Sequence, residues 1–242
     1  MPTQYDKIAT KFQKAADGIQ RKYSLLPSFF LYLGDIKGRR VLDLACGDGY
    51  FSRLMKKCGA LEVVGVDISK KMLVLAKQEE KKNPLGIKYL QYDVAKLPKL
   101  GEFHLVNAAF LLHYAQSKQD LFSMCKNIYE NLGKGGKFIA FNLNPLNPLL
   151  FDGRYGFTIT GKKPLREGDA LTVKLSGNQE NCAFQIYFWN KKTYEQALRS
   201  AGFKKINWQK AIVSQDGIKK FGKDFWQNYE KQPPTIVIEC AK

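Results

Sequence analysis

Short apolar runs alternate with helix-like segments along most of this chain. Runs rich in β-branched and aromatic residues at 40–45, 62–67, 87–91, 103–109 and 137–141 predict five strands. Between them, segments such as 118–131 place apolar side chains three or four residues apart, which predicts helices, and Ser69 is an expected N-cap for the helix carrying Met72. Strands that alternate with helices are typical of a parallel α/β sheet.

Residues 144–190 break this alternation. Two segments there, at 171–175 and 182–188, carry apolar side chains at every second position, which predicts a hairpin with its turn near Gly177 and Asn178. Tyr187 and Trp189 are expected on the opposite face from Ile186. A helix at 193–201, ended by Gly202, and strands at 203–208 and 235–240 complete the pattern. We therefore expect seven core strands with a β-hairpin insertion after strand 5.

The composition indicates one globular unit. The 242 residues are 45% hydrophobic, which is enough to bury a substantial core, and we expect a single domain over 1–242. Within it, 1–38 is an expected N-terminal helical cap and 144–190 a substrate-covering insertion. No apolar run approaches the ~20 residues of a membrane span, the first residues do not resemble a signal peptide, and the five cysteines lack metal-type spacing. These features predict a cytoplasmic protein with free thiols and no membrane partner.

The charge leaves one alternative open. The chain has 39 basic and 22 acidic residues, a net charge of +17, which is compatible with a nucleic-acid partner. Only seven of the basic residues are arginine, the side chain best suited to bidentate recognition of phosphates and bases, and the lysines are scattered in pairs. Nucleic acid is therefore possible but not favoured.

The strongest chemical pattern lies where the first strand ends. Asp43 belongs to the strand, and Gly47 and Gly49 form a turn that opens a helix, where the backbone can approach a ligand closely. Asp67 ends the next strand, a place where an acid accepts hydrogen bonds from ribose hydroxyls. Ser52 stands where a dinucleotide-binding loop needs its third glycine, so the pattern disfavours NAD.

Residues 41–51 resemble motif I of the class I S-adenosylmethionine-dependent methyltransferases, (Asp/Glu)-x-Gly-x-Gly-x-Gly, with Ala45 in place of the first glycine. Segments 64–69, 92–95 and 107–114 resemble motifs II, III and IV of that family, and 194–208 resembles its helix-Gly-Phe-strand segment. Within the family, residues 4–9 and 111–115 look most like the toxoflavin-synthase group of small-molecule N-methyltransferases.

This resemblance implies a Rossmann-like fold of class α/β, with a seven-stranded, mostly parallel sheet and helices on both faces. It also implies S-adenosylmethionine as methyl donor, S-adenosylhomocysteine as product, and no metal. Asp43 would receive the ammonium of the cofactor's amino-acid tail, Asp67 the ribose, and Asp93 the adenine amine. The residues that the resemblance places at the cofactor are Tyr5, Asp43, Ala45, Gly47, Gly49, Asp67, Ile68, Met72, Asp93, Val94 and Phe110.

The acceptor side is less defined by the sequence. His113 and Tyr114 follow the fourth strand at the open edge of the sheet and are candidate catalytic residues, although a structural role is the alternative for His113. Asn142, Tyr187 and Trp189 are candidate substrate-binding residues, with edge packing as the alternative for the last two. Asn107-Ala108-Ala109-Phe110 lacks both prolines of the motif used by base-flipping methyltransferases, which argues against that class.

The expected activity is methyl transfer from S-adenosylmethionine to a nitrogen or oxygen of a small, heterocyclic acceptor. Positioning would supply much of the rate, and a base is needed only if the nucleophile carries a proton. An RNA or protein methyltransferase that uses the basic surface and a non-catalytic cofactor-binding protein are the alternatives. We expect a monomer or homodimer.

Overall fold

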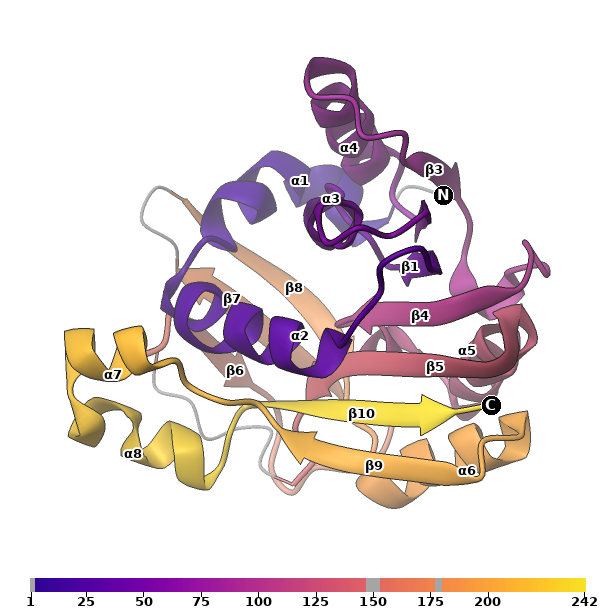
Figure 1. Cartoon of the computed structure of the whole chain (residues 1–242). Helices are drawn as coiled ribbons and strands as arrows, with labels where there is room; N and C mark the ends of the chain where they lie inside the picture. Colours follow the sequence, from indigo (N-terminus) through magenta and orange to yellow (C-terminus); the bar gives the residue numbers. More distant parts are fainter. Residues whose placement is uncertain (1–2, 147–152, 177–179) are drawn as a thin grey trace.

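A seven-stranded sheet forms the centre of the computed structural model, which describes residues 3–146, 153–176 and 180–242 (Figure 1). Its strand order is β3-β2-β1-β4-β5-β10-β9. The first five strands pair in parallel, and β10 is antiparallel to both neighbours. The strands are β1 Arg40–Leu44, β2 Glu62–Asp67, β3 Lys88–Gln91, β4 Phe103–Ala109, β5 Leu132–Leu143, β9 Lys205–Lys210 and β10 Thr235–Ala241.

The order of the strands reverses at β1, which lies between β2 and β4. In open α/β sheets a crevice forms at such a switch point, outside the carboxyl ends of the strands. The fold therefore directs a ligand to the residues that follow β1, β2 and β4.

Helices cover both faces of the sheet. On one face lie α5 (Lys118–Asn131) and α6 (Lys191–Ala201), and on the other α2 (Leu26–Leu33), α3 (Tyr50–Lys57) and α4 (Lys70–Lys82). Local capping explains where several of them begin: Ser69, Ser117 and Asn190 each accept a hydrogen bond from a backbone N–H of the first turn. Gly202 ends α6 in a left-handed conformation, as expected from the sequence.

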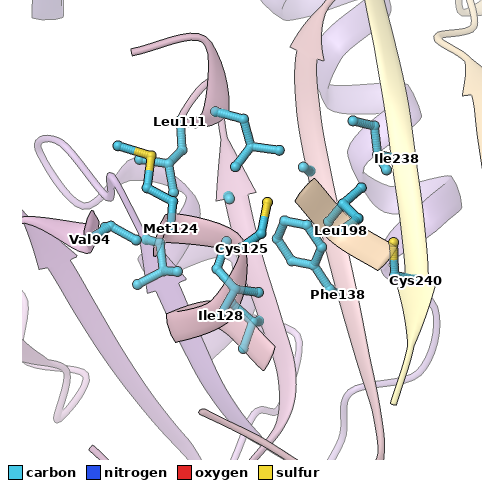
Figure 2. Packing of buried hydrophobic residues seen from close by; sticks show 14 of the residues in the cluster. Val94, Leu111, Met124, Cys125, Ile128, Phe138, Leu198, Ile238 and Cys240 are labelled. Carbon is cyan, nitrogen blue, oxygen red and sulfur yellow. The ribbon is translucent and has the colours of Figure 1, made fainter. Parts of the chain in front are cut away.

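Alternate strand residues fill two separate cores. Leu42 and Phe138 point to the α5–α6 side, where Cys125, Ile128 and Leu198 pack against them (Figure 2). Their neighbours along the strands point the other way, toward α2 and α3. This alternation explains why the buried parallel strands read as nearly continuous apolar runs in the sequence.

A second, three-stranded antiparallel sheet lies beyond the carboxyl edge of the first. It consists of β6 (Phe157–Thr160), β7 (Ala170–Ser176) and β8 (Asn181–Tyr187) in that order. Two short helices pack against it, α7 (Gln215–Phe221) through Ile218 and Phe221, and α8 (Lys223–Lys231) through Trp226 and Tyr229. Before the first strand of the chain come α1 (Gln4–Ala15), a π-helix η1 (Arg21–Leu25) and α2.

The seven core strands and the insertion after strand 5 are confirmed, with three differences. The insertion contributes a third strand, β6, that the sequence pattern did not indicate. Strand β5 begins directly after α5 at Leu132, five residues earlier than expected, and the connection between the last two strands contains the helices α7 and α8, which were not predicted. The predicted turn at Gly177 and Asn178 lies outside the described residues. Within the three described ranges, no helix is both long enough and apolar enough to cross a membrane.

Candidate functional site

A cavity opens between the carboxyl edge of the large sheet and the small sheet. Its empty volume is about 1250 Å³, a figure that includes the part open to solvent. Four structural units line most of it: the glycine loop after β1, the segment that follows β4, the inner face of the small sheet, and the N-terminal helix α1 with the chain that follows it.

The glycine loop approaches the cavity with its backbone. Ala45 and Gly47 both adopt left-handed conformations, with φ of 52° and 57°, and the N–H of Cys46 donates to the carbonyl of Val66 in β2. A Cβ on Gly47 would lie 3.3 Å from the Met72 side chain. Glycine adopts this backbone without strain, so Ala45 carries a cost of about 1–2 kcal/mol where the family motif has glycine.

Two buried carboxylates lie beside this loop without a cationic partner among the described residues. Asp67 accepts hydrogen bonds from the backbone N–H groups of Gly47 and Ser69, each at 2.8 Å. Asp43 accepts from Ser52 Oγ at 2.5 Å and from Asn107 Nδ2 at 2.7 Å. Burial raises the pKa of each carboxyl to about 6. Ser52, which departs from the dinucleotide-binding pattern, is therefore a partner of Asp43.

The far side of the cavity begins where β4 ends. Phe110 is held at φ 64° by a hydrogen bond from its N–H to the Phe141 carbonyl, and its side chain lines the cavity. A bulky residue in the left-handed region stores strain of the kind that occurs at functional sites. His113 and Tyr114, in the short helix η3 (Leu112–Tyr114), line the cavity next to it.

Helix α1 supplies residues to the cavity lining and contacts both α4 and strand β8 of the small sheet. Its course relative to these elements can be followed in Figure 1. Asp6 accepts from Ser69 Oγ at 2.8 Å and from the Lys71 N–H at 3.0 Å, which joins α1 to the start of α4. The Gln4 side chain exchanges two hydrogen bonds with the backbone of Gln185 in β8, and the Tyr5 hydroxyl pairs with that of Tyr114. The helix therefore bridges the two sheets above the cavity.

Arg21 is the one lysine or arginine among the described residues that line the cavity. Its guanidinium lies 4.5 Å from the centre of the Tyr50 ring, a cation–π contact, at the start of α3. It belongs to the π-helix η1, an element that is rare and often found at functional sites. The sequence carried no pattern for this residue, because a single π-turn leaves no periodic trace.

The structure gathers eight of the expected site residues around the cavity. They are Tyr5, Ala45, Gly47, Asp67, Met72, Phe110, His113 and Tyr114. Asp43, Gly49, Asp93 and Val94 are not among the lining residues, and neither is Ile68, which is exposed directly after β2. Asp93 caps the short helix η2 (Val94–Lys96) by accepting from the Ala95 N–H.

The three expected substrate-binding residues do not line the cavity. Strand β8 ends at Tyr187, so the chain turns inward and buries Trp189 in the core beside α5, where its indole N–H donates to the Ala115 carbonyl at 3.0 Å. Tyr187 packs half-buried against the same core. Asn142 is fully buried behind His113. The aromatic side chain that β8 does present to the cavity is Phe184.

The described part of the chain contains no group of three or more His, Cys, Asp or Glu side chains arranged to hold a metal ion. The carboxylates and the histidine of the cavity are instead spread along its length.

Comparison with known proteins identifies the family. Residues 41–136 match the methyltransferase domain family. The chain is 30% identical to demethylmenaquinone methyltransferase of Lactococcus lactis over 186 residues, which cover 74% of this chain and 71% of that protein. It is 26% identical to N-demethylindolmycin N-methyltransferase of Streptomyces griseus over 171 residues, covering 69% of this chain and 70% of that protein.

Other matches are shorter or show the fold alone. A relative from Haemophilus influenzae is 30% identical over 125 residues, so the match spans 50% of this chain and about half of that protein, 48%. The structure of an S-adenosylmethionine-dependent methyltransferase from Mesorhizobium loti superposes with a TM-score of 0.67 at 20% identity, covering 94% of this chain and all of that one. The family match falls on the strands and glycine loop that build the cavity, and the chain belongs to the class I S-adenosylmethionine-dependent methyltransferases.

Proposed function

We propose that this protein transfers a methyl group from S-adenosylmethionine to a nitrogen or oxygen of a small-molecule acceptor bound in the same cavity. The observation that carries the proposal is one continuous cavity with two unlike ends. At one end are a glycine loop and a buried acid, and at the other are mainly apolar and aromatic side chains of the small sheet.

The loop end fits the cofactor on structural grounds. Asp67 accepts from the Gly47 and Ser69 N–H groups on different carboxylate oxygens, and because a carboxylate has about four acceptor sites, capacity remains for a ribose hydroxyl. Asp43 and Asp67 are buried without cationic partners among the described residues, and a ligand that carries ammonium and sulfonium charges would compensate them. Asn107 Oδ1, next to Asp43, is buried without a hydrogen-bond partner in the described structure. Arg21 supplies a cation for the carboxylate of the amino-acid tail.

When bound, S-adenosylmethionine supplies an activated methyl group, and the residues of this chain orient and enclose the reactants. Phe157, Val173 and Phe184 offer apolar surface suited to a flat ring, and α1 with the small sheet keeps water out. The names of the relatives from Streptomyces griseus and Lactococcus lactis, together with the resemblance to the toxoflavin-synthase group, support a small-molecule acceptor over RNA or protein.

Calorimetry tests the cofactor end. S-adenosylhomocysteine should bind at one site, and Asp67→Ala should weaken it by about 1–3 kcal/mol through the lost hydrogen bonds. Arg21→Gln should weaken S-adenosylhomocysteine but not methylthioadenosine, which lacks the amino-acid tail. Equal losses of affinity for both ligands would show that Arg21 does not bind the amino-acid tail. Tight binding of NAD would overturn the choice of cofactor.

Isotope transfer tests the reaction. The protein is incubated with S-adenosylmethionine labelled on its methyl group and with separated small-molecule, RNA and protein fractions of a cell extract. Label should enter the small-molecule fraction. Label confined to RNA or protein would favour an RNA or protein methyltransferase. Binding of the cofactor with no transfer to any fraction would favour a non-catalytic cofactor-binding protein.

A further inference from the structure

His113 and Asn142 form a buried pair at the acceptor side of the cavity. His113 follows β4, is 3% exposed and lines the cavity, and its Nδ1 lies 3.1 Å from Oδ1 of Asn142 in β5. Asn142 itself is fully buried and does not reach the cavity lining. The asparagine therefore acts on the site through the histidine.

The orientation of the Asn142 amide is fixed from behind. Its Nδ2 donates to the Leu143 carbonyl at 3.2 Å, and a carbonyl can only accept, so this end of the amide is the NH₂ group. The Tyr194 hydroxyl is a further partner of the same amide. The end that faces His113 is consequently the oxygen, which can only accept. The hydrogen of the neutral imidazole must then reside on Nδ1, and the lone pair on Nε2, for which the described residues provide no partner.

We propose that Asn142 is a positioning residue that holds His113 in the Nδ1–H tautomer, so that Nε2 accepts the proton of the methyl acceptor. It follows that the site selects acceptors whose reacting nitrogen or oxygen carries a hydrogen. This inference rests on the proposed methyl transfer and deepens it by naming a chemical class of substrate.

The other titratable groups of the described lining are unsuited to this role. Burial raises the pKa of the Cys46 thiol and of the Tyr50 hydroxyl, so both stay protonated, and the Tyr155 hydroxyl donates to the Phe225 carbonyl. The hydroxyls of Tyr5 and Tyr114 are paired with each other, and burial raises the pKa of both, so they stay protonated. Asp67 lies at the cofactor end, where it accepts from two backbone N–H groups, and Asp48 accepts from Gln13. Burial lowers the pKa of His113 to about 4, which keeps Nε2 unprotonated at neutral pH, and a nearby cationic ligand favours the neutral form further.

The step balances in atoms and charge. The acceptor atom forms a bond to the methyl carbon with its electron pair, the bond from methyl to sulfur breaks, and that electron pair stays on sulfur as a neutral thioether. The hydrogen of the acceptor atom passes as a proton to Nε2, which gives an imidazolium with a hydrogen on each nitrogen. One positive charge leaves the sulfonium as one appears on His113, so the cavity holds the same net charge before and after.

The tautomer can be measured directly because the chain has two histidines. In long-range ¹H–¹⁵N spectra of the labelled protein with S-adenosylhomocysteine, His113 should show Nδ1–H and an unprotonated Nε2. Exposed His104 is the internal control, since its Nδ1 accepts from the Arg40 N–H at 3.1 Å and its hydrogen belongs on Nε2. Asn142→Leu should mix the His113 tautomers, whereas Tyr194→Phe, which keeps the Leu143 anchor, should not. An Nε2–H tautomer or an imidazolium in the parent protein at pH 7 would overturn the proposal.

The product of the label-transfer reaction gives the second readout. A nucleophile that loses its hydrogen yields a product with the same charge as the acceptor, whereas a nitrogen that carries no hydrogen yields a permanent cation. Electrophoresis of the labelled product separates these cases, and a permanent cation contradicts the proposal. Asn142→Leu should lower kcat at least tenfold while S-adenosylhomocysteine affinity stays within twofold. If no small molecule is methylated, the proposed function is wrong. The tautomer measurement is independent of that result and still tests the His113–Asn142 arrangement.

Discussion

At the scale of single residues, burial sets the charges of the site in opposite directions. Asp43 and Asp67 have pKa values raised to about 6, and His113 has a pKa lowered to about 4. In the protein without ligand, the two acids contribute stability that is complete below their unfolded pKa of about 4 and is lost as pH rises through 6. The contribution of His113 is present above about 6.5 and is lost as pH falls through 4. At neutral pH the acids are thus ionised at a cost that a cationic or hydrogen-donating ligand offsets.

These pKa values predict how cofactor affinity depends on pH. The ligand binds the ionised carboxylates, so the affinity for S-adenosylhomocysteine should fall as pH decreases from 7 to 5, by about tenfold for each carboxylate that must be ionised. Calorimetry at intervals of one pH unit measures the slope. Asp43→Asn should flatten the profile, and Glu130→Gln, on the exposed side of α5, should leave it unchanged. An affinity that is equal at pH 5 and 7 would show that neither carboxylate meets the ligand.

At the scale of elements, α1 forms a wall of the cavity that is only weakly attached to the rest of the fold. Few of its side chains are buried, and its place over the site depends on polar contacts with the start of α4, with β8 and with Tyr114. A capping box between Thr3 and Asp6 holds its first turn, and Asp6 also makes the contacts to α4. One carboxylate therefore controls both the formation of the helix and its docking.

Substitution of Asp6 tests whether its contacts hold α1 over the cavity. Asp6→Ala removes the carboxylate half of the capping box and the docking contacts, and should destabilise the closed position of α1 by about 1–2 kcal/mol. Hydrogen exchange of amides at 7–15 should then be faster by about 5–30-fold, and cofactor affinity should fall with it. Lys11→Ala, an exposed position on the same helix, is the matched control. Unchanged exchange in Asp6→Ala would mean that apolar contacts alone hold α1 in place.

At the scale of the whole molecule, the tertiary fold determines which aromatic side chains pack in a core and which face the cavity. The sheet turns its carboxyl edge toward the small sheet, and the aromatic rings of the small sheet and of α8 join in a third core next to the cavity. Trp189 leaves this region because β8 ends two residues before it and the chain crosses back to α6. The fold thus separates aromatic residues that are neighbours in the sequence.

This separation predicts the effect of losing Trp189. Trp189→Ala should destabilise the entire fold by about 3–5 kcal/mol, as expected when a buried aromatic ring is removed, and should have no selective effect on the acceptor. Denaturant unfolding measures the loss. Half-buried Tyr187→Ala should show a smaller one, and Phe184→Ala should instead affect binding in the cavity. If Trp189→Ala is as stable as the parent protein but has impaired turnover, Trp189 takes part in substrate binding after all.

The sequence by itself determined the core strands, the helices between them, the glycine loop and the acids at the ends of β1 and β2. These features are local: periodicity follows from which face is buried, and a left-handed turn or a helix cap depends on a few adjacent residues. Ser69 as an N-cap, Gly47 in the cavity wall and His113 at the edge of the sheet were predictable for this reason.

Only the tertiary structure decided which residues face the ligand. Arg21 reaches the cavity from a π-turn, which has no recognisable sequence pattern. Asn142 in β5 contacts His113, which follows the neighbouring strand β4, and no local pattern predicts a contact between residues so far apart in the sequence. Trp189 was misplaced by the sequence because the alternation of faces holds only while a strand lasts, and the end of β8 is set by its pairing with β7. Side-chain direction at the cavity therefore depends on where strands stop and which elements pack across them, which is a property of the whole fold.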